Sequence, residues 1–197
     1  MGLQGYRVEP IRFETAKKFI ERWHYSRSCN GVKISHCFGL YAPQPEFFGI
    51  PKLVGAMIYG TPGMNKQAKK YNPKNPDGVL ELRRLACIDD TPKNAESFFI
   101  GKTLKWLTKH TDIEVVISYA DPNFGHEGII YKASNFKLIG QTAPGMVLMI
   151  DGKRYHDRTL RNPKPYAQVI RNRVASGDAK IQTLPQKAKN IFLYKLR

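Results

Sequence analysis

The stretch that decides the fold is IEVVISYADPNFGHEGIIYKASNF, residues 113–136. Its first eight residues, 113–120, are almost all apolar or β-favouring, which is typical of a strand buried on both faces of a sheet. Asp121 follows at the carboxyl end of that strand, where open α/β sheets usually bind ligands. A loop with Gly, His and Glu then leads to Tyr131, near the start of a helix expected over 128–135. This strand–loop–helix pattern predicts an α/β fold with a candidate site at the strand end.

The helix before this strand is predicted from DDTPKNAESFFIGKTLKWLTKH, residues 89–110. Thr91 and Pro92 suit the N-cap and N1 positions, and Asn94 is a second candidate cap. Either start places Ser97 in the first turn or two. The free N–H groups and dipole of a helix start favour an anion or a developing oxyanion there. The alternative for Ser97 is an ordinary hydrogen bond at a helix start.

The strand before that helix is VLELRRLACI, residues 79–88. Its alternation separates two faces. One face carries Glu81, Arg83 and Leu85, and the other carries Leu82, Arg84 and Ala86. An Arg in a central strand needs a partner or a ligand. The alternative is an edge strand with solvated arginines.

The rest of the chain predicts strands at 5–8, 36–41, 53–59, 137–141 and 146–150, with an amphipathic helix at 12–23. Residues 60–78, rich in Gly, Pro, Asn and Lys, are expected to form a long surface loop. The tail has weaker patterns, helical over 166–174 and strand-like over 191–196. The expected order is β-α-β-β-β-α-β-α-β-β, a mixed sheet with antiparallel early strands and a parallel pair around the central helix. We expect a catalytic domain over 1–152 and a basic C-terminal extension over 153–197 that packs on it.

Charge is the strongest compositional signal. The 197 residues include 32 Lys and Arg against 16 Asp and Glu, a net charge of +16. This favours a polyanionic partner, nucleic acid ahead of membrane, although a merely basic protein is the alternative. The chain has no apolar run of membrane-spanning length. Three cysteines without a CxxC pair indicate a reducing cytosol.

Several motifs together resemble the phage Mom DNA-modification family, within the GNAT-like (N-acetyltransferase-like) fold. They are HYS at 24–26, ELRRL at 81–85, NAES ending at Ser97, and SYAD followed by GHEGIIYKASNF. The resemblance covers roughly residues 6–150. It implies an α/β protein with a mixed, centrally splayed sheet flanked by helices. It also implies an enzyme of the host cytoplasm that converts adenine in double-stranded DNA to N6-(carbamoylmethyl)adenine, which shields phage DNA from host restriction.

The resemblance also implies a catalytic set of Arg84, Ser97, Asp121 and Tyr131. Asp121 would accept the N6 proton or hold the base edge, and Tyr131 would protonate the leaving group. Arg84 and the helix start near Ser97 would bind the donor carbonyl or a phosphate. Each has an ordinary structural alternative: turn chemistry for Asp121 before its proline, and a core hydroxyl for Tyr131.

Base flipping is expected, because an adenine inside a duplex does not reach such a cleft. Aromatic candidates to stack on the base are Tyr25, Phe124 and Tyr71. Other candidates for substrate or DNA contact are His24, Arg83, His126 and the lysines of the 60–78 stretch, namely Lys66, Lys69 and Lys70. For these lysines the alternative is a solvated surface.

The donor is a separate question. GNAT enzymes carry a turn of the form R/Q-x-x-G-x-G/A that cradles coenzyme A, whereas residues 89–95 here read DDTPKNA. Two acids and a proline make a poor anion cradle, so acetyl-CoA is the less suited donor. A glycyl group placed on N6 reaches the carbamoylmethyl product if its amine attacks C6 and the chain migrates. This points to glycyl-tRNA, and a basic surface suits tRNA as well as DNA.

Three matters stay open at this point. Convergence of His24, His36, His126 and Asp121 would create a metal site, but no pair has a recognisable ligand spacing. The oligomeric state is unknown, with a homodimer as one option. The competing functions are an acetyl-CoA-dependent N-acetyltransferase on a small amine or protein, and a non-catalytic basic nucleic-acid-binding protein.

Overall fold

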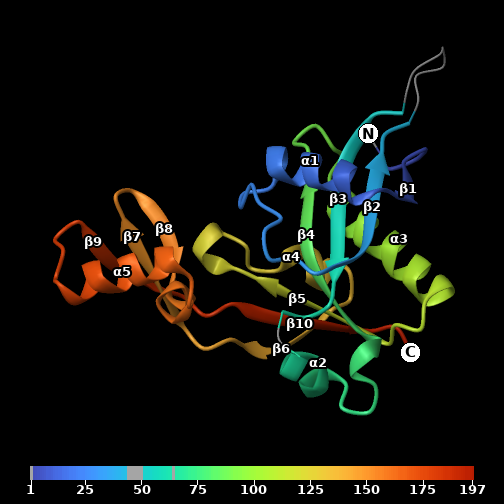
Figure 1. Cartoon of the computed structure of the whole chain (residues 1–197). Helices are drawn as coiled ribbons and strands as arrows, with labels where there is room; N and C mark the ends of the chain where they lie inside the picture. The colour runs from blue at the N-terminus through green and yellow to red at the C-terminus, as the bar shows by residue number, and fades with distance from the viewer. Residues whose placement is uncertain (1, 44–50, 64) are drawn as a thin grey trace. The chain divides into compact units, whose positions relative to one another are not determined.

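The computed structural model describes residues 2–43, 51–63 and 65–197 (Figure 1). The chain forms two compact units. Unit 1 comprises residues 1–120, 128–140 and 191–197, and unit 2 comprises residues 121–127 and 141–190. Each unit is considered by itself below. Within the described residues, no helix is both long and apolar enough to cross a membrane.

Unit 1 is built on a seven-stranded sheet in the order β1-β2-β3-β4-β5-β10-β6. The strands are β1 Arg7–Pro10, β2 Ile34–Tyr41, β3 Leu53–Gly60, β4 Val79–Cys87, β5 Val115–Ala120, β6 Lys137–Gln141 and β10 Asn190–Lys195. Neighbours from β1 to β4 are antiparallel, whereas β4 and β5 are parallel, with Val79 opposite Val115 and Leu82 opposite Ser118. The sheet is therefore mixed, and the predicted parallel pair around the central helix is confirmed.

Four helices accompany this sheet: α1 Phe13–Trp23, α2 Asn65–Tyr71, α3 Ala95–His110 and α4 Ile129–Ala133. A short 3-10 helix, η1, spans Pro76–Gly78. The apolar residues of α3 recur at helical spacing, so Phe99, Leu104 and Leu107 all face the core. A hydrogen bond of 2.7 Å between the buried hydroxyls of Tyr59 and Thr103 fixes α3 to β3. Strands β4 and β5 are therefore supported by a packed apolar core.

Unit 2 has its own small sheet, in the order β8-β7-β9. Its elements are β7 Gly145–Ile150, β8 Lys153–His156, β9 Ile181–Gln186, α5 Pro165–Ala175 and two 3-10 helices, η2 Pro122–Phe124 and η3 Asp157–Arg161. Leu148, Ile150 and Ile170 form its apolar centre. Arg173 joins Asp151 and Asp178 by ion pairs of 2.7 and 2.6 Å.

The structure differs in detail from what the sequence predicted. Residues 60–78 contain α2 and η1 and are not a continuous loop, because NKQAKKY at 65–71 holds good helix formers and no Gly or Pro. Helix α3 begins at Ala95 with Asn94 as its N-cap, so the second of the two candidate caps is confirmed and Thr91 is not the cap. The strands 137–141 and 146–150 do not pair but belong to different sheets, and β8 and β9 were not predicted.

A bulge in β4 changes its simple alternation. Ile58 of β3 pairs with Arg84, but the next residue, Tyr59, pairs with Leu82, so Arg83 is an extra residue without a partner in the register. Bulges redirect side chains and often lie next to active sites. The sequence pattern gave no sign of it.

The predicted boundary between residues 152 and 153 lies inside unit 2, in the turn between β7 and β8, and the last seven residues belong to unit 1.

Candidate active site

Arg84 is fixed against the loop that follows α1. Its Nε donates to the carbonyl oxygen of Ser28 at 3.0 Å, and its Nη1 donates to the carbonyl oxygen of Arg83 at 2.7 Å. Burial lowers the pKa of Arg84, while Tyr25 raises it. Two of the guanidinium nitrogens are thus held by backbone, and within the described residues no hydrogen bond engages Nη2. This orients a half-buried cation at the bulge in β4.

The neighbouring Arg83 has protein partners. Its Nη1 donates to Glu81 at 3.1 Å and to the carbonyl oxygen of Thr61 at 3.3 Å. Its Nε is buried and has no hydrogen-bond partner among the described residues. The ion pair meets the requirement of a strand arginine for a partner, while a substrate contact by Arg83 stays a prediction.

His24 and Tyr25 lie together at the end of α1. The imidazole of His24 is buried, and its Nδ1 accepts from the backbone N–H of Ser26 at 3.1 Å. The rings of His24 and Tyr25 are 4.2 Å apart, and Tyr25 is 49% exposed. Because Nδ1 is an acceptor, the neutral ring carries its proton on Nε2. This arrangement presents the Tyr25 ring at the surface.

Tyr131 is positioned by a glycine that no other residue replaces without strain. Gly128 caps α4 with φ of 85°, and a Cβ there would lie 2.2 Å from the Phe192 ring of β10. The close approach lets Phe192 pack on Tyr131, with ring centroids 5.2 Å apart, and Phe136 lies 5.6 Å away on another side. Tyr131 is therefore buried within an aromatic cluster.

The surroundings of Tyr131 keep its phenol neutral. Burial raises the pKa of Tyr131 to about 12, a hydrogen bond with Ser118 lowers it, and Tyr25 and Glu81 raise it further. Ser118 donates its own hydroxyl proton to the carbonyl oxygen of Leu82 at 3.0 Å, so its lone pairs are available to Tyr131. A neutral phenol can serve as a proton donor, which agrees with the role that the resemblance implies.

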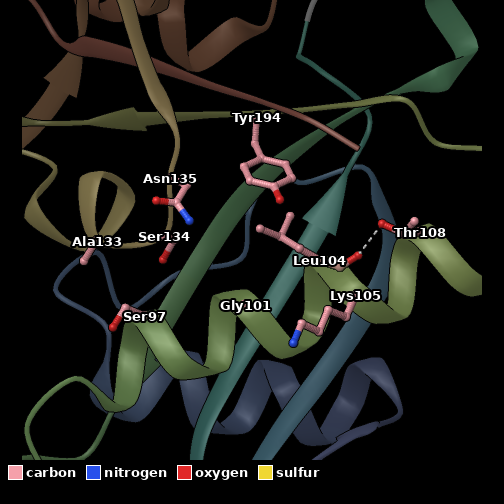
Figure 2. Close-up of a pocket in the computed structure, with 9 residues that line it drawn as sticks. All are labelled: Ser97, Gly101, Leu104, Lys105, Thr108, Ala133, Ser134, Asn135 and Tyr194. Carbon is pink, nitrogen blue, oxygen red and sulfur yellow. Dashed lines mark hydrogen bonds between the residues drawn. The ribbon is translucent and has the colours of Figure 1, made fainter. Parts of the chain in front are cut away.

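A pocket of about 230 Å³ lies between α3, the end of α4 and β10 (Figure 2). Ser97 stands at one end, where its hydroxyl donates to the carbonyl oxygen of Asn94 at 3.1 Å. The other lining residues are Gly101, Leu104, Lys105, Thr108, Ala133, Ser134, Asn135 and Tyr194. The volume is smaller than a site for a drug-sized ligand, and Lys105 supplies a positive charge. The pocket suits a small polar or anionic group.

Asp121 belongs to unit 2 and has a different environment. Its side chain is 4% exposed and caps η2 by accepting from the N–H of Asn123 at 3.1 Å. Its Oδ2 forms an ion pair of 2.8 Å with Lys189. Burial raises the pKa of Asp121, but the hydrogen bonds of Lys189 and Asn123 and the charge of Lys189 outweigh it, so the pKa lies below its ordinary value. The carboxylate therefore stays charged.

The other predicted contact residues are more exposed. Phe124 is 43% exposed, with the guanidinium of Arg154 over its ring at 5.5 Å, and His126 is exposed in the same loop. Lys66, Lys69 and Lys70 are exposed on α2. Their contacts with nucleic acid stay predictions.

A metal site would require His24, His36, His126 and Asp121 to converge on one ion. The described residues hold no group of three or more His, Cys, Asp or Glu side chains arranged for a metal ion.

Sequence reasoning missed the residues that surround the predicted ones. Asn123, two positions after Asp121, was a recognisable turn signal. Lys189 gave no signal, because its link to Asp121 depends on tertiary structure. The lining of the pocket by Lys105, Asn135 and Tyr194 depends in the same way on how α3, α4 and β10 pack.

Comparison with known structures shows the fold. The ribosomal-protein-S5-alanine acetyltransferase of Vibrio fischeri matches with a TM-score of 0.53 and 11% identity, over 99% of this chain and 95% of that one. A spermidine N-acetyltransferase of Vibrio cholerae matches with a TM-score of 0.53 and 9% identity, over 98% of this chain and 94% of that one. The predicted GNAT-like fold is confirmed.

Comparison of sequences shows the family. The methylcarbamoylase Mom of Escherichia phage Mu is 32% identical over 162 residues, which are 81% of this chain and 63% of that protein. This chain thus spans less than two thirds of that relative's length. The profile of the Mom protein family matches residues 5–195. The chain therefore belongs to the Mom protein family.

Proposed function

We propose that this protein is a transferase that modifies the exocyclic amine of adenine in double-stranded phage DNA. The observation that carries this proposal is the family match over residues 5–195. The acyltransferase fold and the similarity to the methylcarbamoylase Mom of phage Mu support it. The product we propose is N6-(carbamoylmethyl)adenine, and its role is protection of phage DNA from host restriction.

The site offers groups for each requirement of such a transfer. Adenine N6 is a poor nucleophile, so the reaction needs close positioning, a held donor and a proton donor for the leaving group. Tyr131, with its pKa of about 12, supplies the proton donor. Arg84 supplies an oriented cation for the donor carbonyl or a phosphate.

The pocket beside Ser97 is the proposed binding site for the acyl group of the donor. Its size suits an acyl group such as glycyl, and Ser97 and Lys105 contribute polar atoms to its wall. Gly101 faces open space, since a Cβ built there meets no atom within 4 Å. Gly101→Phe should fill the pocket and abolish transfer, whereas the control Gly101→Ala should keep transfer and add about 0.5–1 kcal/mol of helix stability. Transfer at the normal rate by a folded Gly101→Phe protein would place the donor elsewhere.

Coenzyme A is the less suited donor carrier. The turn before α3 uses its amides internally, because Thr91 N–H donates to Ile88 at 3.1 Å and Ala95 N–H donates to Pro92 at 3.1 Å. Asp89 and Asp90 are exposed there and repel a pyrophosphate. We therefore favour an aminoacyl donor, glycyl-tRNA.

The proposed route conserves atoms. Adenine N6 attacks the glycyl ester, the ester C–O bond breaks, and the tRNA hydroxyl leaves with one proton. The glycyl amine then attacks C6, the bond between C6 and N6 breaks, and the original N6 becomes the terminal amide nitrogen of the carbamoylmethyl group. This second step is an isomerisation and needs no further reactant.

The test uses purified protein and duplex DNA that carries ¹⁵N at the exocyclic amine of adenine. With glycyl-tRNA, we expect a carbamoylmethyl product whose ¹⁵N lies in the terminal amide by fragment mass. Label attached to the ring carbon would contradict the glycyl route, as would product formation after complete RNA digestion. Acetylation of DNA or of a small amine with acetyl-CoA would support the acetyltransferase alternative instead.

DNA engagement completes the proposal. Tyr25, which is exposed, is the proposed stacking residue for an extruded base, at about 1–3 kcal/mol, and the exposed Phe124 is the alternative. Lys66, Lys69 and Lys70 on α2 are proposed phosphate contacts. Replacing one of them should weaken binding to all duplex sequences and reduce the slope of affinity against salt by about 1.

A further inference from the structure

The carboxylate of Asp121 is almost fully occupied by hydrogen bonds. Oδ1 accepts from Asn123 twice, from the backbone N–H at 3.1 Å and from Nδ2 at 2.7 Å. Oδ2 accepts from the ammonium of Lys189 at 2.8 Å. A carboxylate has about four acceptor positions, two on each oxygen. Among the described residues, one position on Oδ2 therefore remains.

Hydrogen bonds to Asn123 and Thr142 fix the backbone of the segment that carries Lys189. Asn123 bridges to Lys187, donating Nδ2–H to its carbonyl oxygen at 3.1 Å and accepting its N–H at 2.9 Å. The backbone of Lys189 pairs with Thr142, whose N–H donates at 2.9 Å and whose hydroxyl accepts at 3.0 Å. The ion pair is thus built on a fixed backbone, unlike a pair between two mobile surface side chains.

We propose that Lys189 is a positioning residue that orients Asp121 and keeps it charged, so that the remaining acceptor position of Asp121 Oδ2 receives an N–H of the adenine amine. This inference rests on the proposed function. It chooses between the two roles considered for Asp121, in favour of holding the base edge.

Two physical arguments support this choice. A carboxylate whose pKa lies below the ordinary value is a weak base at neutral pH, because proton transfer is most effective when the acceptor's pKa is near the working pH. A charged acceptor in a buried place gives a stronger hydrogen bond than a neutral one. Lys189 is the charged side chain that contacts the Asp121 carboxylate and lowers its pKa.

The competing reading is that Lys189, which is 46% exposed, contacts a DNA phosphate. The two readings predict different changes in Lys189→Met. The matched control is Lys187→Met, in the same segment, since Lys187 is exposed and its side chain forms no ion pair within the described residues. Lys189→Arg keeps the charge and serves as the rescue variant.

The first measurement is a ¹³C NMR titration of the Asp121 carboxyl, which requires no activity. We expect Lys189→Met to raise the pKa of Asp121, Lys187→Met to leave it unchanged and Lys189→Arg to restore it. An Asp121 pKa that is the same in wild type and Lys189→Met would overturn the proposal.

The second measurement is the pH dependence of DNA modification beside the salt dependence of duplex binding. Lys189→Met should lower kcat, move the acid limb to higher pH and leave the salt slope unchanged. A salt slope reduced by about 1 with normal kcat would show a phosphate contact instead. If wild type modified no DNA, the proposed function would fail, while the NMR titration would still decide whether Lys189 controls Asp121.

Discussion

Tyr131 and Asp121 lie ten residues apart in sequence but in two differently built surroundings. Tyr131, in unit 1, is enclosed by the rings of Phe136 and Phe192, and burial raises its pKa to about 12. Asp121, in unit 2, is equally buried but is satisfied by Lys189 and Asn123, and its pKa lies below the ordinary value. Burial alone would push both groups toward their neutral forms. The difference is that Asp121 has the cation of Lys189 beside it, whereas the described groups that act on Tyr131 are Ser118, Tyr25 and Glu81.

This contrast assigns chemical roles. When their environments move the pKa values of two titratable groups in opposite directions, one remains a proton donor and the other a charged acceptor over the same pH range. Here the phenol is protonated and the carboxylate is ionised at neutral pH. The predictions below test this contrast, from the largest effect to the smallest.

The strongest test removes only the phenolic oxygen. Tyr131→Phe should reduce the modification rate by about 10²–10⁴-fold, the usual contribution of a positioned proton donor. The aromatic cluster should survive, so the melting temperature and the affinity for duplex DNA should stay close to wild type. Tyr166→Phe, at an exposed tyrosine of unit 2, is the control and should modify DNA normally. A Tyr131→Phe rate within a few-fold of wild type would remove Tyr131 from the chemistry.

The second test compares two glycines with similar backbones. Gly128 (φ of 85°) touches Phe192, whereas Gly125 (φ of 75°), in the Asp121 loop, faces open space. Gly128→Ala combines backbone strain with a steric clash and should lower the free energy of unfolding by roughly 2–5 kcal/mol. Gly125→Ala carries the strain alone and should lower it by about 1–2 kcal/mol. Urea denaturation of both variants measures this, and equal losses would mean that Phe192 simply moves aside.

The third test follows stability at alkaline pH. The folded pKa of Tyr131 is raised above the unfolded value of about 10, so the unfolded chain loses the proton first. Stability from this group is therefore present below pH 10 and is lost as pH rises toward 12, by about 2–3 kcal/mol. Tyr131→Phe should lack this pH-dependent contribution to the free energy of unfolding. The difference between the free energies of unfolding of the wild type and the variant, plotted against pH, therefore separates the contribution of Tyr131 from those of Tyr59 and Tyr119. If the free energies of unfolding of the wild type and Tyr131→Phe changed in parallel from pH 9 to 12, the pKa of Tyr131 would not be strongly raised.

The smallest expected effect is at acid pH. Because the folded pKa of Asp121 is lowered, its contribution to stability is present above the unfolded pKa and is lost as pH falls through the folded one. Asp121→Asn should be less stable than wild type at neutral pH, and the difference should shrink in acid. Chemical denaturation between pH 2 and 6 measures this difference in the free energy of unfolding. A difference that grew as the pH fell would mean that the folded protein raises the pKa of Asp121 and does not lower it.

Local sequence predicted the centre of the fold well, because β4, α3, β5 and α4 have strong apolar patterns and clear turn residues. It also placed Tyr131 near the start of a helix and Arg84 on a strand, while leaving open whether that strand is central or at an edge. It failed at α2, where Lys and Asn made a helix look like a loop. At the start of α3 it offered two caps, and the structure uses Asn94, with a left-handed backbone. The β4 bulge and the pairing of Asp121 with Lys189 depend on strand register and packing, which no local pattern contains.

The most direct test of the whole account is the mass spectrum of nucleosides from plasmid DNA. The plasmid is grown in bacteria that express the wild-type chain or Tyr131→Phe at equal levels. We predict a new deoxyadenosine species, heavier by one carbamoylmethyl group, with the wild type and its near absence with the variant. Unmodified deoxyadenosine in the presence of folded, DNA-binding wild-type protein would contradict the account.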